Sequence, residues 1–270
     1  MKKFKANTDI GQNFLVDTRI LNKIVAAAEI ISEDVILEIG AGKGVLTRRL
    51  LGTPVRHLHS VEIDRRLAPF LSPLEEDERL TISWGDVLKM DLAEILRPLP
   101  VKIVANLPYH ITTPVIWKVL EELAPRGIQK MILMVQKEAA DRLVWGKPGK
   151  NRSPLGVTLL RMGSVEKLFD VPPNAFNPPP RVDSTVIAVS LDNSLGLAVN
   201  PLWRELLRRS FSQRRKTLFN NLKSWEVLSP AQWECFLRDL GLRDRIRAEE
   251  LSGENWEDFR TGLEKVKGGF

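Results

Sequence analysis

Hydrophobic and polar positions along the first half of the chain form blocks that predict strands followed by helices. Each block contains a short apolar run that stops at glycine, acidic or amide residues. The blocks lie at 34–51, 57–64, 79–88, 101–114 and 130–143. Strands that alternate with helical segments predict an α/β fold with a doubly wound, mostly parallel sheet. Ligands of such sheets bind at the carboxyl ends of the strands.

The pattern changes in the second half of the chain. Residues 154–191 predict two further strands flanking a proline-rich loop, after a loop at 146–154 that is rich in glycine, proline and positive charge. From about residue 192 the apolar spacing is helical, with one apolar stripe running from Trp203 to Leu222. A Ser-Pro pair at 229–230 predicts the start of another helix. We therefore expect an α/β domain over 1–191 and a smaller all-helical domain over 192–270.

Composition is consistent with a water-soluble globular protein. The chain has 270 residues, of which 43% are hydrophobic, enough for one sizeable core and a smaller appended unit. Its apolar runs are shorter than the ~20 residues that a membrane span needs, and the N-terminal sequence does not resemble a secretory signal. The single cysteine, Cys235, allows no internal disulfide, and no residue spacing indicates a metal site. These features predict a cytoplasmic protein.

Positive charge is concentrated in one segment. The net charge of the chain is +6, and residues 201–223 contain seven Lys/Arg against one glutamate, so that this segment alone accounts for the excess. A local basic excess is typical of nucleic-acid binding. A solvated basic helix face would have the same composition. The nucleic-acid interpretation assigns RNA binding to Arg208, Arg214, Arg215 and Lys216 of a basic helix at 201–223.

The first strand–helix junction is typical of a nucleoside-binding loop. Gly40, Gly42 and Gly44 lie between strand and helix, where glycines let a backbone approach a ligand. Glu62 follows at the end of the next strand, where a carboxylate can accept hydrogen bonds from ribose hydroxyls. Asp86, at the end of the third strand, suits an adenine amine. A ribose and an adenine site without a diphosphate site indicate S-adenosylmethionine, although a purely structural turn would need the same glycines.

The stretch Asn106-Leu107-Pro108-Tyr109 ends the fourth predicted strand with an amide, a proline and the chain's one tyrosine. An adenine amine is a poor nucleophile because its lone pair is delocalised into the ring. The Asn106 amide oxygen and the Leu107 carbonyl can accept both amine hydrogens, and Pro108 makes the turn rigid. Base–aromatic stacking on Tyr109 would contribute roughly 1–3 kcal/mol. The four residues are interpreted as an adenine clamp for methyl transfer, which depends on positioning more than on a strong base.

Taken together, these motifs resemble the small-subunit ribosomal RNA adenine dimethyltransferase family. The resemblance rests on motifs in the family's order, which cover nearly the whole chain. They are IGQNFLVD (10–17), EIGAGKGVLT (38–47), VEID (61–64), GD (85–86), NLPYHITTP (106–114), VQKEAADRL (135–143), VPPNAFNPPPRVDS (171–184), RRKTLFNNL (214–222) and RAEELS (247–252).

The resemblance implies the reaction and most of the site. It implies transfer of four methyl groups from S-adenosylmethionine to two adjacent adenosines near the 3′ end of small-subunit (16S) rRNA, within an immature 30S particle and by a monomer. It implies cofactor contacts by Asn13 and Leu15 together with the pocket residues named above. It also implies that Phe176 holds the flipped adenine against Tyr109. Four positions depart from the family's common pattern: Ala41, His110, Leu155 and Arg161.

Other functions share parts of this pattern. Large-subunit rRNA adenine methyltransferases that confer macrolide resistance share the pocket and the clamp, but the C-terminal motifs resemble the small-subunit group better. DNA adenine methyltransferases usually begin the clamp with aspartate, and glutamine methyltransferases carry Asn-Pro-Pro-Tyr. A non-catalytic ribosome-assembly factor could use the basic segment alone. A nicotinamide dehydrogenase is the weakest alternative, since no hydride-transfer site is apparent.

Overall fold

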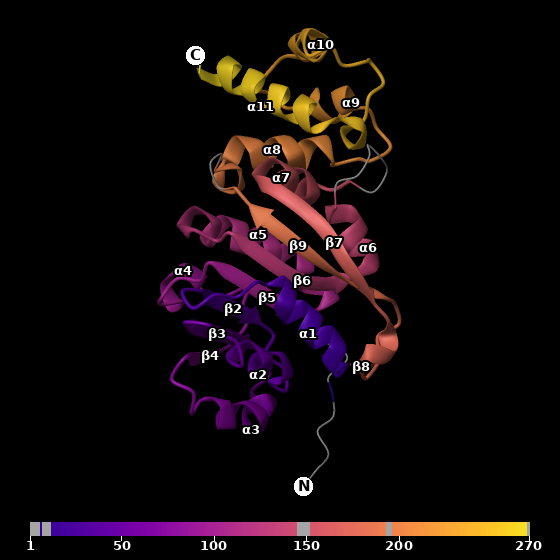
Figure 1. Ribbon diagram of the computed structural model, residues 1–270. Helices are drawn as coiled ribbons and strands as arrows, with labels where there is room; N and C mark the ends of the chain where they lie inside the picture. Colours follow the sequence, from indigo (N-terminus) through magenta and orange to yellow (C-terminus); the bar gives the residue numbers. More distant parts are fainter. Residues whose placement is uncertain (1–5, 7–11, 145–151, 193–195, 269–270) are drawn as a thin grey trace. The chain divides into compact units, whose positions relative to one another are not determined.

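Seven strands form one sheet in the order β4-β3-β2-β5-β6-β9-β7, and a separate two-stranded sheet pairs β1 with β8 (Figure 1). The computed structural model describes residues 6, 12–144, 152–192 and 196–268. The strands are β1 (Phe14–Leu15), β2 (Val35–Ile39), β3 (His57–Glu62), β4 (Leu80–Trp84), β5 (Lys102–Asn106), β6 (Lys130–Gln136), β7 (Gly163–Val171), β8 (Phe176–Asn177) and β9 (Ser184–Leu191).

The helices in these described residues alternate with the strands first and then follow one another. They are α1 (Thr18–Ala27), α2 (Val45–Leu51), α3 (Ala68–Leu71), α4 (Leu92–Ile95), α5 (Thr112–Glu122), α6 (Lys137–Leu143), α7 (Pro154–Met162), α8 (Pro201–Ser210), α9 (Leu218–Leu222), α10 (Pro230–Asp239) and α11 (Gly253–Gly268). None of them is long and apolar enough to cross a membrane.

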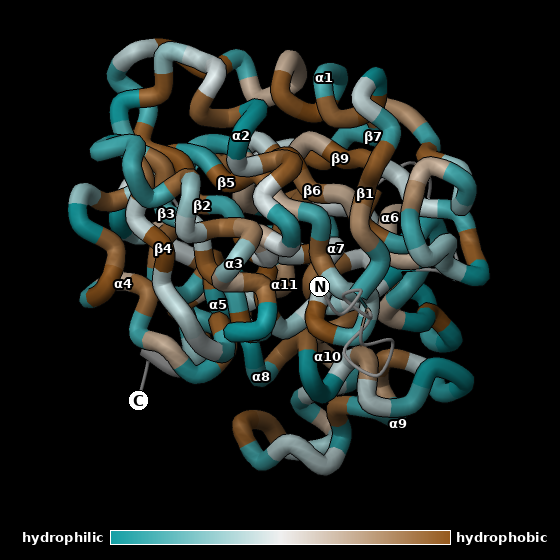
Figure 2. Tube along the Cα trace, turned by 90° about the horizontal axis from the view of Figure 1, so that it is seen from below, coloured by the Kyte–Doolittle hydropathy of each residue, from teal (hydrophilic) through white to brown (hydrophobic). Residues whose placement is uncertain are grey.

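Strands β4, β3, β2, β5 and β6 run parallel, and β9 and β7 run antiparallel to their neighbours. All five residues of β2 are buried, because helices cover both faces of the sheet at its centre. The hydropathy colours in Figure 2 follow this pattern, with hydrophobic residues along β5, β6 and β9. The expected doubly wound, mostly parallel sheet is confirmed, as is the helical C-terminal part.

The chain divides into two compact units. The first comprises Met1–Ala140 and Gly163–Asn193, and the second comprises Asp141–Met162 and Ser194–Phe270. The units therefore differ from the expected 1–191 and 192–270 division in one segment, because the stretch 141–162 groups with the C-terminal helices. Most of the basic loop 146–154 lies outside the described residues.

The two strands expected within 154–191 are present as β7 and β9, on either side of the proline-rich loop, but a helix was not expected at residues 154–162. They form α7, whose first turn is capped by Ser153, since its hydroxyl accepts a hydrogen bond from the Gly156 amide at 3.1 Å. Most of α7 is buried, including Leu155 and Leu159. A helix that is apolar on nearly every side lacks the one-sided periodicity that separates helices from buried strands.

The predicted single helix over 201–223 is also wrong. It is two helices, α8 and α9, joined by residues 211–217. The Asn221 side-chain amide donates to the carbonyls of Ser210 at 2.8 Å and Gln213 at 3.2 Å, which stabilises the chain where α8 ends. The helix predicted from the Ser-Pro pair is present as α10, with Ser229 and Gln232 forming a capping box.

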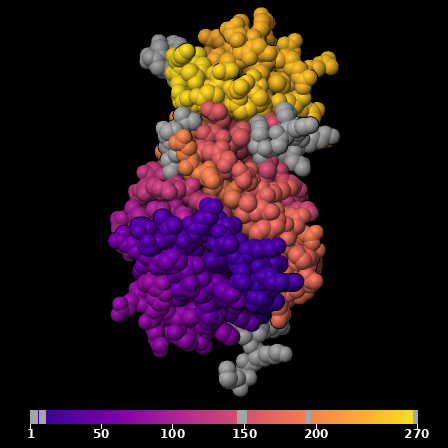
Figure 3. Space-filling model, viewed as in Figure 1, coloured from indigo at the N-terminus to yellow at the C-terminus, as the bar shows by residue number. Residues whose placement is uncertain are grey.

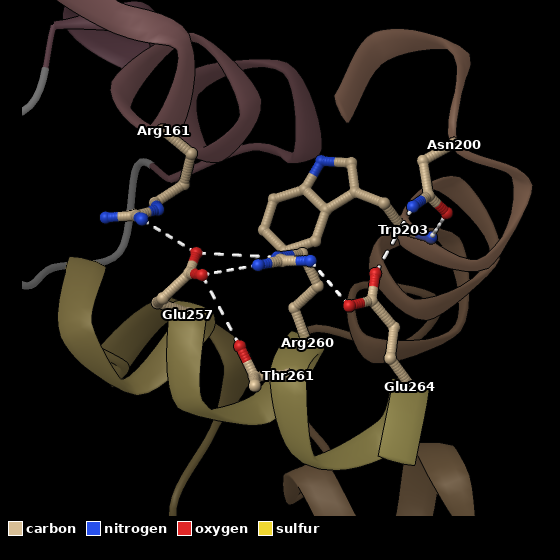
Figure 4. A network of polar contacts seen from close by, with 7 residues as sticks. All are labelled: Arg161, Asn200, Trp203, Glu257, Arg260, Thr261 and Glu264. Atoms are coloured by element: carbon tan, nitrogen blue, oxygen red, sulfur yellow. Dashed lines mark hydrogen bonds and ion pairs between the residues drawn. The ribbon is translucent and has the colours of Figure 1, made fainter. Parts of the chain in front are cut away.

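Aromatic residues form the core of the second unit. Trp203, Trp233, Trp256 and Phe259 are each at most 1% exposed, and their rings pack at centroid distances of 6.0 to 6.2 Å. A polar network lies beside Trp203 and joins α7, α8 and α11 (Figure 4). In it, Glu257 accepts hydrogen bonds from Arg161 at 2.7 Å and from Arg260 at 2.5 Å. Arg161, one of the departures from the family pattern, thus has an ion-pair partner within its own unit.

Candidate active site

The carboxyl ends of four parallel strands surround one cavity in the first unit. The cavity, together with the open space at its mouth, has a volume of about 830 Å³. Among its lining residues are Gly40 after β2, Glu62 of β3, Asp86 after β4 and Asn106 of β5. Strand β2 lies between β3 and β5, so the cavity is at the point where the strand order reverses.

The Glu62 carboxylate holds two backbone segments beside the cavity, one at Gly42 and one at Asp64. Its Oε2 accepts a hydrogen bond from the Gly42 amide at 2.8 Å, and its Oε1 accepts one from the Asp64 amide at 2.8 Å. Each carboxylate oxygen has a second lone pair, so both can still accept a ligand hydroxyl. Burial raises the pKa of Glu62 above its ordinary value, and the two amide hydrogen bonds oppose that rise.

The glycine loop has the shape that its sequence predicts. Gly42 has a φ of +59°, in the left-handed region that favours glycine, and a Cβ at this position would lie 3.2 Å from the Phe14 ring. Lys43 in turn lies over the same ring, with Nζ 4.8 Å from its centroid. The ring of Phe14 therefore packs directly on the loop, and no residue spacing in the sequence predicts this contact.

The Asn106 amide is oriented by the N-terminal segment. Its Nδ2 donates to the Asn13 main-chain carbonyl at 3.3 Å. A carbonyl oxygen can only accept, so the amide nitrogen must face Asn13 and the Oδ1 is available to a ligand in the cavity. The following Leu107 amide donates to the Met134 carbonyl of β6 at 3.1 Å, which holds the turn to the sheet.

Aromatic residues from distant parts of the chain reach the same cavity. Tyr109, in the turn after β5, and Phe176, in β8, both line it. Strand β8 pairs with β1, so that Leu15 is opposite Phe176 and Phe14 is opposite Asn177. In Figure 3 the indigo N-terminal residues lie beside the salmon-coloured residues of this region.

Most residues that were expected to bind cofactor or base line this cavity. They are Asn13, Gly40, Gly42, Glu62, Asp86, Asn106, Leu107, Pro108, Tyr109 and Phe176. Leu15 does not line it, because its side chain is 6% exposed and lies in the hydrophobic core with Leu21 and Ile24. The first two residues of the 10–17 motif lie outside the described residues.

Comparison with known proteins identifies the family. The family model described as ribosomal RNA adenine dimethylase matches residues 3–263. The chain belongs to the ribosomal RNA adenine dimethylase family. It is therefore an enzyme of the rRNA adenine dimethyltransferase class, and membership of this methyltransferase family implies a methyl donor of the S-adenosylmethionine type.

Individual relatives cover almost the full chain. The ribosomal RNA small subunit methyltransferase A of Thermosynechococcus vestitus is 41% identical, over 93% of this chain and 94% of the relative. The protein of that name from Neisseria meningitidis is 38% identical, over 95% of both. Among solved structures, a dimethyladenosine transferase from Plasmodium falciparum has a TM-score of 0.81 at 28% identity, covering 94% of this chain and 98% of that one. The 23S rRNA methyltransferase ErmE has a TM-score of 0.70 at 23% identity, covering 93% and 100%, and shows a shared fold.

Several cavity residues of this dimethylase family member were not predicted from its sequence. Gln12, Phe14, Ile63, Val87 and Ile111 all line the cavity. Ile63 is 53% exposed although it is an isoleucine, and this exposure is visible only in the structure. In the described residues no cluster of three or more His, Cys, Asp or Glu could hold a metal ion.

The expected RNA-binding residues lie in the second unit. Arg214, Arg215 and Lys216 are exposed in the segment that joins α8 to α9. Arg208 is on α8, where its guanidinium pairs with Glu205 at 2.6 Å, and Arg209 pairs with the same carboxylate at 2.5 Å. The joining segment also has a carboxylate nearby, because Glu249 lines a small pocket together with Arg214 and Lys216.

A second carboxyl group, that of Glu38, is fully buried and links β2 to α2 and β3. Glu38 of β2 accepts hydrogen bonds through Oε2 from the hydroxyls of Thr47 at 2.7 Å and Ser60 at 2.6 Å. Its Oε1 has no hydrogen-bond partner among the described residues. Burial is the largest cause that raises the pKa of Glu38 to about 7.

This pKa predicts a pH dependence of stability. Because the folded pKa of about 7 exceeds the ordinary 4.5, the contribution of Glu38 is fully present below about pH 4.5 and is lost as pH rises through 7. Glu38→Gln removes the titrating group. Between pH 5 and pH 8 the melting temperature of this variant should therefore fall less than that of the wild type, and the two decreases should differ by about a few degrees. Thermal unfolding at both pH values measures the difference. The exposed Glu33→Gln is the control, and an equal fall in wild type and Glu38→Gln contradicts the assignment.

Proposed function

We propose that this chain transfers methyl groups from S-adenosylmethionine to the exocyclic amines of two adjacent adenosines in the loop of the 3′-terminal helix of small-subunit (16S) rRNA. The relatives that are 36–41% identical over nearly their full length are named as small-subunit methyltransferases, which supports this substrate over large-subunit RNA. We further propose that the enzyme is a cytoplasmic monomer that acts on an immature 30S particle.

The cavity fits S-adenosylmethionine by its donors and acceptors. Glu62 provides two carboxylate oxygens suited to the ribose hydroxyls, and Asp86 provides an acceptor for the adenine amine. The Gly40–Gly42 loop lets the ligand approach the backbone closely, because neither residue has a Cβ. Asn13 covers the site from the N-terminal side, and Leu15 holds that segment in the core. When bound, S-adenosylmethionine supplies an electrophilic methyl group.

The oriented Asn106 amide is the observation that carries the proposed mechanism. Its Oδ1 and the carbonyl of Leu107 each accept one hydrogen of the adenine amine, which draws the nitrogen lone pair out of conjugation with the ring. Pro108 fixes the turn between these acceptors and Tyr109. The rings of Tyr109 and Phe176 hold the flipped base and exclude water. Without a metal or a strong base among the residues invoked, the rate depends on orientation.

The RNA is held by charge on the second unit. Arg208, Arg214, Arg215 and Lys216 contact phosphates, which fixes the position of the RNA without reading its sequence. Arg214 donates through Nη2 to the Arg152 carbonyl at 3.1 Å, so its side chain is already partly ordered. A non-catalytic assembly factor would need these charges but not Glu62 or Asn106.

Product analysis tests the proposed substrate. Purified protein and S-adenosylmethionine are incubated separately with unmethylated 30S and 50S particles, and the rRNAs are examined by mass spectrometry, with protein-free incubations as controls. We expect dimethyladenosine at two adjacent positions near the 3′ end of small-subunit RNA. Methyl groups confined to large-subunit RNA, or tight 30S binding without methylation, would overturn the proposal.

Asn106→Ala should lower kcat by at least a hundredfold while the Kd for RNA changes little, because the lost acceptor acts on the reacting amine. Single-turnover methylation and filter binding measure the two quantities. Asn106→Asp is the matched variant, since it keeps an acceptor oxygen and replaces the donor to Asn13 by a negatively charged oxygen. It should retain much more activity than the alanine variant. A parallel loss of binding and turnover in Asn106→Ala argues against the role.

Replacing Arg214, Arg215 and Lys216 by glutamine should weaken RNA binding and flatten its salt dependence. Each lost phosphate contact reduces the slope of log K against log salt by roughly 0.7–0.9. The control replaces three exposed arginines of the first unit, Arg56, Arg97 and Arg126, and changes the net charge equally. If both triple variants have the same slope, the RNA surface has been assigned to the wrong residues.

A further inference from the structure

The chain uses tyrosine at one position only, although it contains ten phenylalanines. That position, Tyr109, lines the cavity beside the clamp residues Asn106 and Leu107. Stacking of a base uses the face of an aromatic ring, and phenylalanine provides the same face. The proposed role of Tyr109 in base stacking therefore leaves its hydroxyl group unexplained.

The hydroxyl of Tyr109 has a defined partner. Its Oη lies 2.9 Å from the Oγ of Ser184, a residue that is 1% exposed. Burial raises the pKa of the Tyr109 phenol above its ordinary value, so the group keeps its proton at neutral pH and remains able to donate. Ser184 is not among the residues that line the cavity. Any effect of Ser184 on a bound base must therefore pass through Tyr109.

Ser184 is much more firmly held than the turn that carries Tyr109. It is the first residue of β9 and is opposite Gln136 of β6 on one side and Val171 of β7 on the other. The preceding residue, Asp183, accepts a hydrogen bond through its carbonyl from the Lys137 amide at 3.0 Å. Tyr109 begins a single 3-10 turn after Pro108, with no ladder pairing of its own. The Ser184 hydroxyl is thus held in place by the sheet, whereas the Tyr109 ring is held by fewer backbone contacts.

We propose that Ser184 is a positioning residue, whose hydrogen bond to the Tyr109 hydroxyl fixes the axis of that ring and so the surface against which the target adenine stacks. The bond pins the end of the ring farthest from the backbone, which limits rotation about the Cα–Cβ bond. A tilted ring would displace the adenine amine from the Asn106 and Leu107 acceptors, and methyl transfer is sensitive to displacements of this size. This inference rests on the proposed clamp role of Tyr109.

A double-mutant cycle tests the proposal. Ser184→Ala and Tyr109→Phe each remove the same hydrogen bond, so each should lower kcat by about fivefold. The double variant should be no slower than either single variant, because nothing further is lost. The KM for S-adenosylmethionine and the Kd for RNA should be unchanged. Ser184→Thr, which keeps a hydroxyl, should recover most of the wild-type rate.

The neighbouring residue provides the matched control. Thr185 is fully buried on the same strand, and its hydroxyl donates to Asp170 at 2.7 Å, so its hydrogen bond does not involve Tyr109. If Ser184 only stabilised β9, Thr185→Val should resemble Ser184→Ala and both should combine additively with Tyr109→Phe. Additive effects of Ser184→Ala and Tyr109→Phe, or a wild-type kcat in both, would overturn the proposal.

A direct probe uses the single tyrosine. Protein labelled with ¹³C-tyrosine gives ring signals from Tyr109 alone, and these should shift in Ser184→Ala and stay in place in Thr185→Val. Tyr109→Ala separates this inference from the proposed function on which it rests. Full activity of Tyr109→Ala would refute the clamp itself. Inactive Tyr109→Ala together with fully active Ser184→Ala and Tyr109→Phe would refute only the role of Ser184.

Discussion

The pairing of β2 with both β3 and β5 is the constraint on which the site depends. In this register Ile39 is opposite Val61 on one side and Ala105 on the other. The chain that leaves β2 therefore passes between Glu62 and Asn106, and the Gly40 amide donates to the Val61 carbonyl at 2.8 Å. A slip of one residue in either pairing would turn Glu62 or Asn106 to the opposite face of the sheet. Buried apolar residues on both faces of β2 oppose such a slip.

Hydrogen bonds then convert this register into a rigid cavity wall. Glu62 binds backbone amides at Gly42 and Asp64, so two loops from neighbouring strands are held by one carboxylate. Glu38 binds hydroxyls from α2 and β3 directly behind the glycine loop. Carboxylates of this kind are costly to bury, and their hydrogen bonds offset part of the cost. The buried carboxylates of Glu62 and Glu38 therefore hold the backbone around the glycine loop in a fixed position.

The short β1–β8 sheet links the two halves of the cavity. It brings Leu15 opposite Phe176, although 160 residues of chain separate them. The Asn13 carbonyl, directly before β1, orients the Asn106 amide, and Phe14 packs on Gly42. The same N-terminal segment is therefore connected to the glycine loop, to the base clamp and to the strand that carries Phe176. The proposed cofactor and base subsites thus share one structural element, a geometry suited to transfer between two ligands held at once.

The sequence by itself determined the strand–helix alternation, the parallel sheet and the polar residues at its strand ends. These depend on local features: apolar run length, glycine between strand and helix, and acids or amides where strands stop. Local pattern was insufficient for α7, which is buried on most sides and has no polar face, and for the break between α8 and α9, which Asn221 stabilises from a later turn. Only the tertiary structure decided that Phe14 packs on the glycine loop, that Asn13 orients Asn106 and that Ser184 meets Tyr109. Such contacts join residues 28 to 93 positions apart, and the strand pairing that brings them together leaves no periodic trace in the sequence.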